Sequence, residues 1–554
     1  MLEGFRLPVV CGILLCALCF HRASEHRAGA KKPYKKPNFI VILADDIGWG
    51  DLDINQPEKG TNNTPNLNLM AQQGLRFLDF HSPASTCSPS RASILTGRYG
   101  LRNGVTHNFA VGSVGGLPLS EVTLPQLLQE AGYYSAMIGK WHLGHNGPYG
   151  PTQRGFDYYL GVPYSNDMGC TDVPGYNLPQ CPPCDSSGSQ NLRERGQPYF
   201  LYIALAHMHV PLAPQSFPPE TSTGHPPPDR QVYAASLREM DDLVGAIKSA
   251  SHASDTFIWF TGDNGPWEQK CQYAGSPGPF KGTWQTKRGG GSAKRTTWEG
   301  GHRVPTVAYW PGVIPANSTS SALLSGMDIF PTLLSLAEVI PPSDRRYDGI
   351  DASRVLLHGE QIGHKVLFHP NSGAAGRFGD LQAVRAGKYK AFYMTGAAEA
   401  CGGDVGTQEL HNPPLIFDLE HDEAEATPLK VDTREHQEGR GACWSLSQQH
   451  SGGRWGTPWK SRCLITWPTQ IDRQHSHSHS DIRANLVLPI NLCVVLIQGD
   501  LFFSLYFFFH PSIHFLLVIP FEVAGGPGAQ LSSIRAEGGV HPGQVAISSQ
   551  GQHR

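Results

Sequence analysis

Two short polar pairs in this sequence could together bind a metal ion. Asp45-Asp46 and Asp263-Asn264 each follow an apolar run. Their carboxylate and amide oxygens form an all-oxygen ligand set, which suits a hard divalent cation and favours calcium over zinc. Taken singly, the first pair could be a turn with a helix cap, and T-G-D-N-G could be a hairpin turn.

A second centre of chemistry is Cys87, which opens the sequence C-S-P-S-R-A-S-I-L-T-G-R. Pro89 is typical of the first turn of a helix and Gly97 of the residue that ends one, so a short helix starting near Cys87 is predicted. The positive end of that helix would attract an oxyanion such as sulfate. The alternative is a buried free or disulfide-bonded cysteine in a Ser/Pro turn.

Four nearly continuous apolar runs should position these residues, each as a strand buried on both faces. Helical patterns at 124–131 and 232–250 lie between them, which predicts an α/β fold with a mostly parallel or mixed sheet. Functional residues gather at the carboxyl ends of strands in such sheets. The runs are 39–43 before Asp45, 134–138 before Lys140 and His142, 199–205 before His207 and His209, and 257–260 before Asp263.

The N-terminus has the features of a secretory signal, because the apolar run 7–20 ends near the small residues Ala23 and Ser24. An uncleaved anchor is the alternative, but the run is short for a membrane span. Sequons at Asn62 and Asn317 agree with entry into the secretory pathway, where they would be glycosylated.

The 554 residues, 40% of them hydrophobic, allow a large core with at least one smaller unit. The smaller unit could hold an antiparallel sheet of 389–393 and 415–419. In the last part of the chain the apolar run 501–521 is interrupted by Pro and His, so a membrane span there is not expected. The expected organisation is a signal peptide at 1–24, a basic arm at 25–36, a large α/β domain at 37–387, the start of a smaller domain at 388–430 and a low-complexity, apolar tail at 431–554.

Charge and cysteine content narrow the class of protein. The net charge is −3 and the basic residues cluster only at 31–36, so nucleic-acid binding is not expected. Twelve cysteines include three in the signal, and eight besides Cys87 could form bridges in an oxidising compartment. The cysteines within 170–184 suggest disulfides over zinc, and Cys271 with Cys401 is a plausible long-range bridge.

Several separated motifs resemble, in their order along the chain, those of the sulfatase family of the arylsulfatase A type. The resemblance covers about residues 37–429 and is greatest to the arylsulfatase G branch. It implies the alkaline-phosphatase-like fold, with a large mixed-sheet α/β domain and a smaller C-terminal α+β domain that is truncated here. The motifs are S-T-C-S-P-S-R-A-S, G-K-W-H-L-G-H, A-L-A-H-M-H-V-P, T-G-D-N-G-P-W and T-T-W-E-G-G-H-R-V-P.

The resemblance implies a sulfuric ester hydrolase in which Cys87 is converted to formylglycine by the formylglycine-generating enzyme. The hydrated aldehyde has one hydroxyl to take the sulfuryl group and one to expel it. Arg91 would hold the hydrate, while Lys140 and Lys294 would bind sulfate oxygens. The family pattern assigns one calcium ion to Asp45, Asp46, Cys87, Asp263 and Asn264.

The remaining roles concern proton transfer and substrate contact. His142 would take a proton from the second hydroxyl so that sulfate leaves. His209, with Lys294, would contact the substrate and protonate the departing alcohol. Asp263 would also accept the proton of the attacking hydroxyl, and Ser165 in P-Y-S-N-D would contact the sulfate.

By resemblance, the substrate is a sulfated carbohydrate, such as sulfated glucosamine of heparan sulfate, and small aryl sulfates are artificial substrates. The same resemblance implies delivery through the secretory pathway to the lysosome, with retention in the endoplasmic reticulum or secretion as alternatives. A phosphodiesterase of the same superfamily would need Ser or Thr as nucleophile and more ligands for a second metal, so Cys87 argues against it.

A different alternative is a non-catalytic or poorly folded sulfatase-like isoform that binds sulfated ligands without turnover. Two departures from the family pattern motivate it. The segment 185–198 is too short for the helix that the family has there, which would leave an apolar sheet face open. The tail after 429 would replace the final strand and helix of the family.

Overall fold

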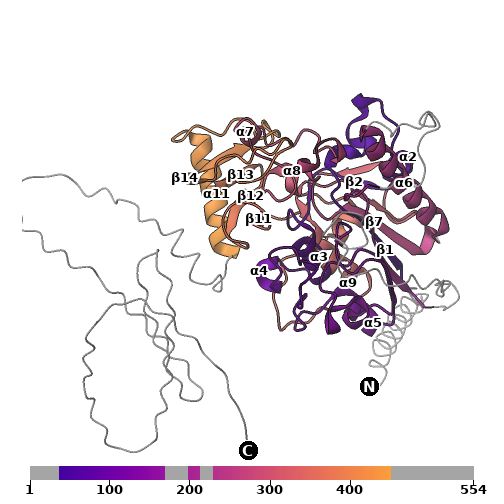
Figure 1. The fold of residues 1–554 in the computed structure, drawn as a ribbon. Coiled ribbons are helices and arrows are strands. Elements are labelled where there is room, and N and C mark those ends of the chain that lie inside the picture. The colour runs from indigo at the N-terminus through magenta and orange to yellow at the C-terminus, as the bar shows by residue number, and fades with distance from the viewer. Residues whose placement is uncertain (1–35, 169–196, 213–228, 252, 451–554) are drawn as a thin grey trace, which may run out of the picture. The chain divides into compact units, whose positions relative to one another are not determined.

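The computed structural model describes residues 36–168, 197–212, 229–251 and 253–450, and the statements below concern these residues (Figure 1). The predicted signal peptide, the cysteines within 170–184 and the run 501–521 lie outside them. Of the segment 185–198, only the last two residues are described.

Within the described residues, the largest sheet has eight strands in the order β5-β4-β6-β1-β7-β8-β2-β9. The five strands from β5 to β7 in this order are parallel to one another, whereas β8 is antiparallel to both of its neighbours, β7 and β2. The four apolar runs form the strands β1, β4, β6 and β7, as predicted. Of these, β1 and β7 are buried throughout, whereas Ile138 near the end of β4 is exposed. The strands are β1 (Asn38–Ala44), β2 (Leu75–Phe77), β4 (Tyr134–Gly139), β5 (Tyr158–Leu160), β6 (Tyr199–Ala204), β7 (Thr256–Gly262), β8 (Thr306–Tyr309) and β9 (Ser318–Ser320).

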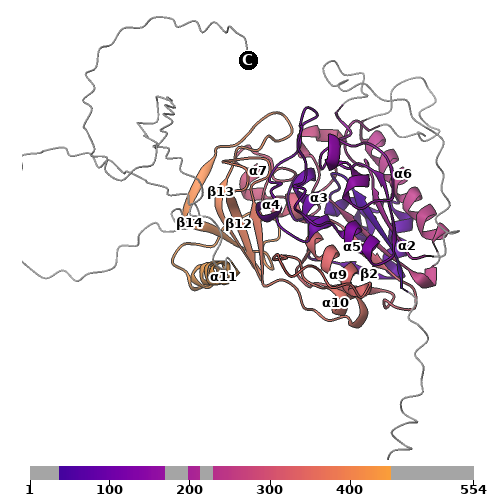
Figure 2. The ribbon, with the colours of Figure 1, turned by 90° about the horizontal axis from the view of Figure 1, so that it is seen from below.

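Helices cover both faces of this sheet, as Figures 1 and 2 show. Side chains alternate along β1, so that Val41 faces one core and Ile42 the other. The core around Val41 includes side chains of α3, α5 and α9, and the core around Ile42 includes those of α2 and α6. The helices are α2 (Pro65–Gln72), α3 (Cys87–Thr96), α4 (Gly100–Asn103), α5 (Leu124–Glu130), α6 (Asp229–Ala250), α7 (Thr283–Thr286), α8 (Glu299–His302), α9 (Ile329–Leu336) and α10 (Ser353–His358), and β3 (Phe80–His81) pairs with β10 (Leu324–Ser325).

A second, antiparallel sheet of four strands corrects both expected boundaries of the smaller domain. Its strands are β11 (Val366–Pro370), β12 (Leu381–Ala386), β13 (Tyr389–Thr395) and β14 (Glu409–Asp418). Strand β11 pairs with β12, and β12 pairs with β13. Because β11 and β12 thus belong to the same sheet as β13, this domain begins before residue 388. Helix α11 (Arg434–His450) packs on β12 and β13 and buries Cys443, so the ordered fold also continues past residue 431.

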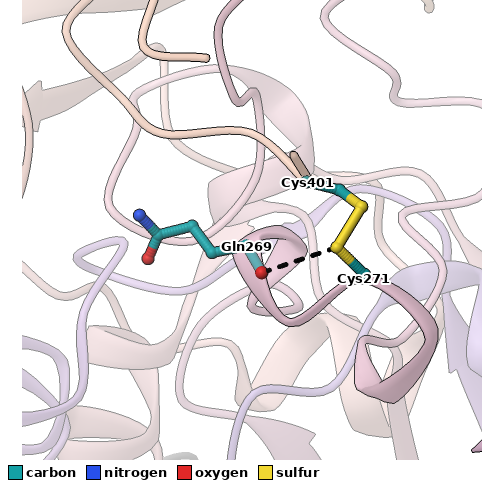
Figure 3. Close-up of a disulfide and its surroundings, with 3 residues drawn as sticks. All are labelled: Gln269, Cys271 and Cys401. Atoms are coloured by element: carbon teal, nitrogen blue, oxygen red, sulfur yellow. Dashed lines mark hydrogen bonds between the residues drawn. A yellow bond between two sulfur atoms is a disulfide. The ribbon is translucent and has the colours of Figure 1, made fainter. Parts of the chain in front are cut away.

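The two sheets are linked covalently and by packing. Cys271 and Cys401 form the disulfide that the sequence suggested, with the Gln269 carbonyl oxygen 3.7 Å from Cys271 Sγ (Figure 3). The Trp298 ring stacks on Phe392 of β13 with centroids 4.1 Å apart. The smaller sheet is therefore fixed against the loops that follow β7.

Two surface features bear on the remaining expectations. At the β5 edge of the large sheet, Ile138 and Leu160 are 38% and 54% exposed. Among the described residues, no helix has both the length and the apolar character needed to cross a membrane. Asn62 and Asn317 are both exposed.

Candidate active site

The carboxyl ends of four neighbouring parallel strands meet at one edge of the large sheet. Because β4, β6, β1 and β7 are consecutive, residues that follow them converge although they are far apart in sequence. The structure brings the predicted residues together there and buries all of them. They are Asp45, Asp46, Cys87, Arg91, Lys140, His142, Ser165, His209, Asp263, Asn264 and Lys294.

Cys87 is the first residue of α3, as predicted, and Gly97 ends this helix with a φ of 66°. The thiol is free, fully buried and 3.5 Å from Asp45 Oδ1. Burial and the charge of Asp45 raise the pKa of Cys87 far above its usual range. The side chain therefore remains a neutral thiol, which is a poor nucleophile and a poor metal ligand.

Three buried carboxylates are matched by three buried cations. Lys140 Nζ lies 2.6 Å from Asp45, and Lys294 Nζ lies 2.6 Å from Asp46. Although burial acts to raise it, Lys140 and other nearby cations hold the pKa of Asp45 well below its usual range. Burial and the like charge of Asp45 raise the pKa of Asp263 to about 6.

These residues fit a divalent cation with oxygen ligands. Asn264 Nδ2 donates to Asp46 Oδ1 at 2.7 Å, but Asn264 Oδ1 is buried without a hydrogen-bond partner within the described part of the chain. A buried acceptor of this kind is costly unless a ligand satisfies it. A divalent cation bound with a divalent sulfate would also leave the charge balance of the site unchanged.

One group of potential ligand atoms combines three residues of the predicted set with His209. One atom each from Asp45, Asp46, Cys87 and His209 lies within 4.8 Å of the others. The sequence assigned His209 to substrate contact and proton transfer and not to the metal. A hard cation prefers carboxylate and amide oxygens to the sulfur of Cys87 or the nitrogen of His209. Asp263 and Asn264 therefore remain the expected ligands alongside Asp45 and Asp46.

His142 is held as a neutral base. Its Nε2 lies 2.9 Å from the Phe109 carbonyl oxygen, which can only accept, so Nε2 carries the proton. Its Nδ1 is buried and has no hydrogen-bond partner in the described residues, which leaves a lone pair available. Burial and Lys140 lower the pKa of His142 well below its usual value. Its φ of 57°, like that of Asp46, is in the left-handed region that non-glycine residues rarely adopt.

His209 has a different environment. Its Nδ1 donates to the Val210 carbonyl oxygen at 2.6 Å, and its Nε2 lies 3.7 Å from Asp46 and 4.0 Å from Asp167. Burial and Lys294 lower the pKa of His209, while Asp46 acts in the opposite direction. Nε2 is thus the ring atom that faces the other site residues.

Two residues of the site were not assigned from the sequence. Asp167 lies beside His209. Burial acts to raise the pKa of Asp167, but His209 and a hydrogen bond from Ser165 lower it below its usual value. The Trp267 ring lies 4.4 Å from Lys294 Nζ and 5.2 Å from the His209 ring. Asp167 belongs to the motif P-Y-S-N-D and Trp267 to the motif T-G-D-N-G-P-W. The sequence of a motif does not tell which of its side chains face the site.

A second group of potential ligands, Asp79, His81 and Glu299, is a structural ion network. Its carboxylates are already bonded to cations, with Arg303 at 2.6 Å from Asp79 and Lys390 at 2.8 Å from Glu299. The Glu299–Lys390 bond joins α8 of the large domain to β13 of the smaller one.

Comparison with known proteins decides the family. The sulfatase family model matches residues 37–339, and a model of the C-terminal region of aryl-sulfatase matches residues 362–452. The chain belongs to the sulfatase family. The second match also corrects the expectation that the tail begins at residue 431.

Relatives of this sulfatase have closely similar sequences. Arylsulfatase G of Canis lupus familiaris is 56% identical over 451 residues, covering 73% of this chain and 83% of that protein. N-acetylgalactosamine-6-sulfatase of Mus musculus is 35% identical, covering 76% and 87%. The crystal structure of the PsFucS1 sulfatase from Pseudoalteromonas sp. superposes with a TM-score of 0.62 at 26% identity, covering 75% of this chain and 90% of that one. The chain is therefore a sulfatase, which hydrolyses sulfate esters, with the alkaline-phosphatase-like fold.

Proposed function

We propose that this sulfatase hydrolyses sulfate esters of sugars with a formylglycine at position 87 and one calcium ion. The observation that supports this most is the position of Cys87, at the N-terminus of α3 and 3.5 Å from Asp45. Its raised pKa makes the unmodified thiol unsuitable as a nucleophile. A hydrated aldehyde at this position would supply two hydroxyls, one to accept the sulfuryl group and one whose deprotonation releases it.

The cations around Cys87 would stabilise the charge of the sulfuryl group. Lys140 and Lys294 act electrostatically on position 87, and Arg91, on the next turn of α3, is fixed by Asp263. Such preorganised cations are effective because the site is buried and excludes water. A calcium ion held by Asp45, Asp46, Asp263 and Asn264 would add positive charge next to the sulfate oxygens.

His142 and the pair of His209 and Lys294 suit opposite proton transfers. His142, neutral with a free Nδ1, would accept the proton of the second hydroxyl as sulfate leaves. His209 and Lys294 would together protonate the alcohol oxygen of the ester. Because Nδ1 of a neutral His209 already donates to Val210, the ammonium of Lys294 would supply that proton. Asp263, which would also bind the calcium ion, would accept the proton of the attacking hydroxyl.

The proposed substrates are sulfated carbohydrates, in particular sulfated glucosamine units of heparan sulfate. A sugar substrate is supported by the name of a relative at 35% identity, N-acetylgalactosamine-6-sulfatase. Passage through the secretory pathway to the lysosome is supported by the N-terminal apolar run and by the exposure of Asn62 and Asn317, which leaves both sequons accessible for glycosylation.

The test is a mass spectrum of the tryptic peptide that carries residue 87, from protein made in eukaryotic secretory cells. We expect the mass of formylglycine, together with turnover of an aryl sulfate. Cys87→Ala should abolish turnover, and Cys87→Ser should nearly abolish it, because a seryl sulfate has no second hydroxyl to expel sulfate. An unmodified cysteine in a chain that binds sulfated sugars without turnover would favour the non-catalytic alternative.

A further inference from the structure

Among the described residues, the side chain of Asp167 forms no ion pair with Lys or Arg. It is 30% exposed as a whole, but its Oδ1 is buried and has no hydrogen-bond partner in the same part of the chain. The three buried carboxylates of the site are each bonded to Lys or Arg within 3 Å. The ion-pair contact recorded for Asp167 is His209 Nε2, at 4.0 Å, which is too long for a hydrogen bond.

The loop that carries Asp167 is tied to the catalytic loop that follows β4. Backbone amides of Trp141 and His142 donate to the carbonyl oxygens of Val162 and Pro163, at 2.9 and 3.1 Å. The backbone a few residues before Asp167 is therefore held by the same hydrogen bonds that hold the backbone of His142. A group held in this way is preorganised for a ligand.

We propose that Asp167 is a specificity-determining residue that accepts a hydrogen bond from a hydroxyl or ammonium group of the sugar next to the sulfate ester. The inference deepens the proposed function and rests on His209 contacting the alcohol oxygen of the ester. A substituent on the carbon beside that oxygen then lies within reach of Asp167 Oδ1. An ionised, partly desolvated acceptor strongly favours such a donor over a bare hydrocarbon edge.

A different role would be to orient or charge His209. That role would affect every ester of a weakly acidic alcohol, because such an alcohol must be protonated as it leaves. Direct recognition affects only substrates with a donor beside the ester. The two roles are separated by cyclohexyl sulfate, an alkyl sulfate whose leaving alcohol needs the proton as a sugar does, but which has no hydroxyl or amine beside its ester.

The experiment compares Asp167→Asn and Asp167→Ala with the unchanged chain and with Asn166→Ala. The last is a matched control in the same loop, since among the described residues the Asn166 side chain donates its hydrogen bond to the Pro211 carbonyl oxygen, at 3.4 Å, on the exposed side. The substrates are cyclohexyl sulfate and glucosamine 3-sulfate, whose ester lies between an ammonium and a hydroxyl group. For the sugar we expect kcat/KM to fall about 10- to 100-fold in both Asp167 variants, mainly through KM. For cyclohexyl sulfate and for Asn166→Ala, we expect changes below about threefold.

Equal losses on both substrates, or no loss on either, would overturn the proposal. A binding measurement tests the role of Asp167 independently of the proposed catalytic function. In a Cys87→Ala background, calorimetry should show that Asp167→Asn weakens the binding of glucosamine 3-sulfate about tenfold or more and leaves the binding of cyclohexyl sulfate unchanged. If the unchanged chain has no turnover, the proposed catalysis fails, and this pair of affinities still decides the role of Asp167.

Discussion

Arg91 donates through Nε to Asp263 Oδ2 at 2.8 Å and so ties helix α3 to the end of strand β7. Arg91 is four residues after Cys87, on the same face of the helix. The ion pair therefore fixes the orientation of Cys87 relative to the carboxylates. A second contact, from Arg91 to the Lys140 carbonyl oxygen at 2.8 Å, adds the end of β4 to the same frame.

The first prediction is that Arg91→Gln lowers the free energy of unfolding by about 3–5 kcal/mol, because it leaves Asp263 and Asp45 buried beside one another without this counter-ion. Denaturant unfolding followed by circular dichroism measures this. The control is Arg354→Gln, which breaks an ion pair with Glu360 in which the arginine is 69% exposed and should cost below about 1 kcal/mol. Equal losses in the two variants would contradict the buried ion pair.

The second prediction is that calcium stabilises the chelator-treated protein, by about 2.7 kcal/mol at one hundred times its dissociation constant. Magnesium should stabilise it less, because it demands stricter octahedral geometry. Asn264→Ala should reduce the calcium-dependent rise in melting temperature by removing the unsatisfied Oδ1. Asn103→Ala, at a buried amide that bonds to Arg98 and Val105, should lower stability but keep the calcium effect. Stabilisation by zinc and not by calcium would refute the site.

The third prediction concerns pH. Burial, opposed in part by Lys390, raises the pKa of Glu425 to about 7, above its value near 4.5 in an unfolded chain. Because the folded state binds this proton more tightly, the stabilisation is complete below about pH 4 and is lost as pH rises through 7.

We therefore expect the free energy of unfolding to fall by up to about 3 kcal/mol more between pH 5 and pH 8 in the unchanged chain than in Glu425→Gln. Unfolding at the two pH values measures the difference, and groups that titrate in both proteins cancel. Glu58→Gln, at an exposed position, should keep the pH dependence. A parallel pH dependence in Glu425→Gln would show that Glu425 has an ordinary pKa when folded.

The fourth prediction is that a chain ending after residue 452 keeps the thermal stability and activity of the full chain, whereas one ending after residue 430 loses both. The shorter chain lacks α11, which buries His436 and Cys443 against the smaller sheet. Each large side chain left uncovered costs about 1.5–3 kcal/mol. Equal melting temperatures for the two truncated chains would show that α11 contributes little.

The strands and the main site residues could be predicted because their signals are local. A strand buried on both faces must be a short apolar run, and Asp45 and Asp263 follow such runs directly. The motif around Cys87 also determines its own helix, with Gly97 at the end. These features depend on neighbours in sequence, which a single chain displays.

The boundaries of the smaller domain were predicted wrongly because the residues that define them depend on contacts with distant elements. Strand β12 carries Gln382 and Arg385, and its polar side chains are buried only because partners from other elements satisfy them. Helix α11 contains Gly439 and Gly441, which disfavour a helix in isolation. A Cβ at Gly439 would lie 2.8 Å from Ile416 Cγ2, so this glycine allows the helix to approach the sheet closely.

The sequence by itself determined which groups could do chemistry and which strands would carry them to one edge. Only the tertiary structure decided their partners and protonation: which lysine neutralises Asp45 or Asp46, which nitrogen of His142 bears the proton, and that Asp167 and Trp267 face the site. Partner choice and pKa depend on distances of a few ångströms between residues up to 248 positions apart, such as Asp46 and Lys294, and on their burial. Such distances exist only once the sheet has assembled.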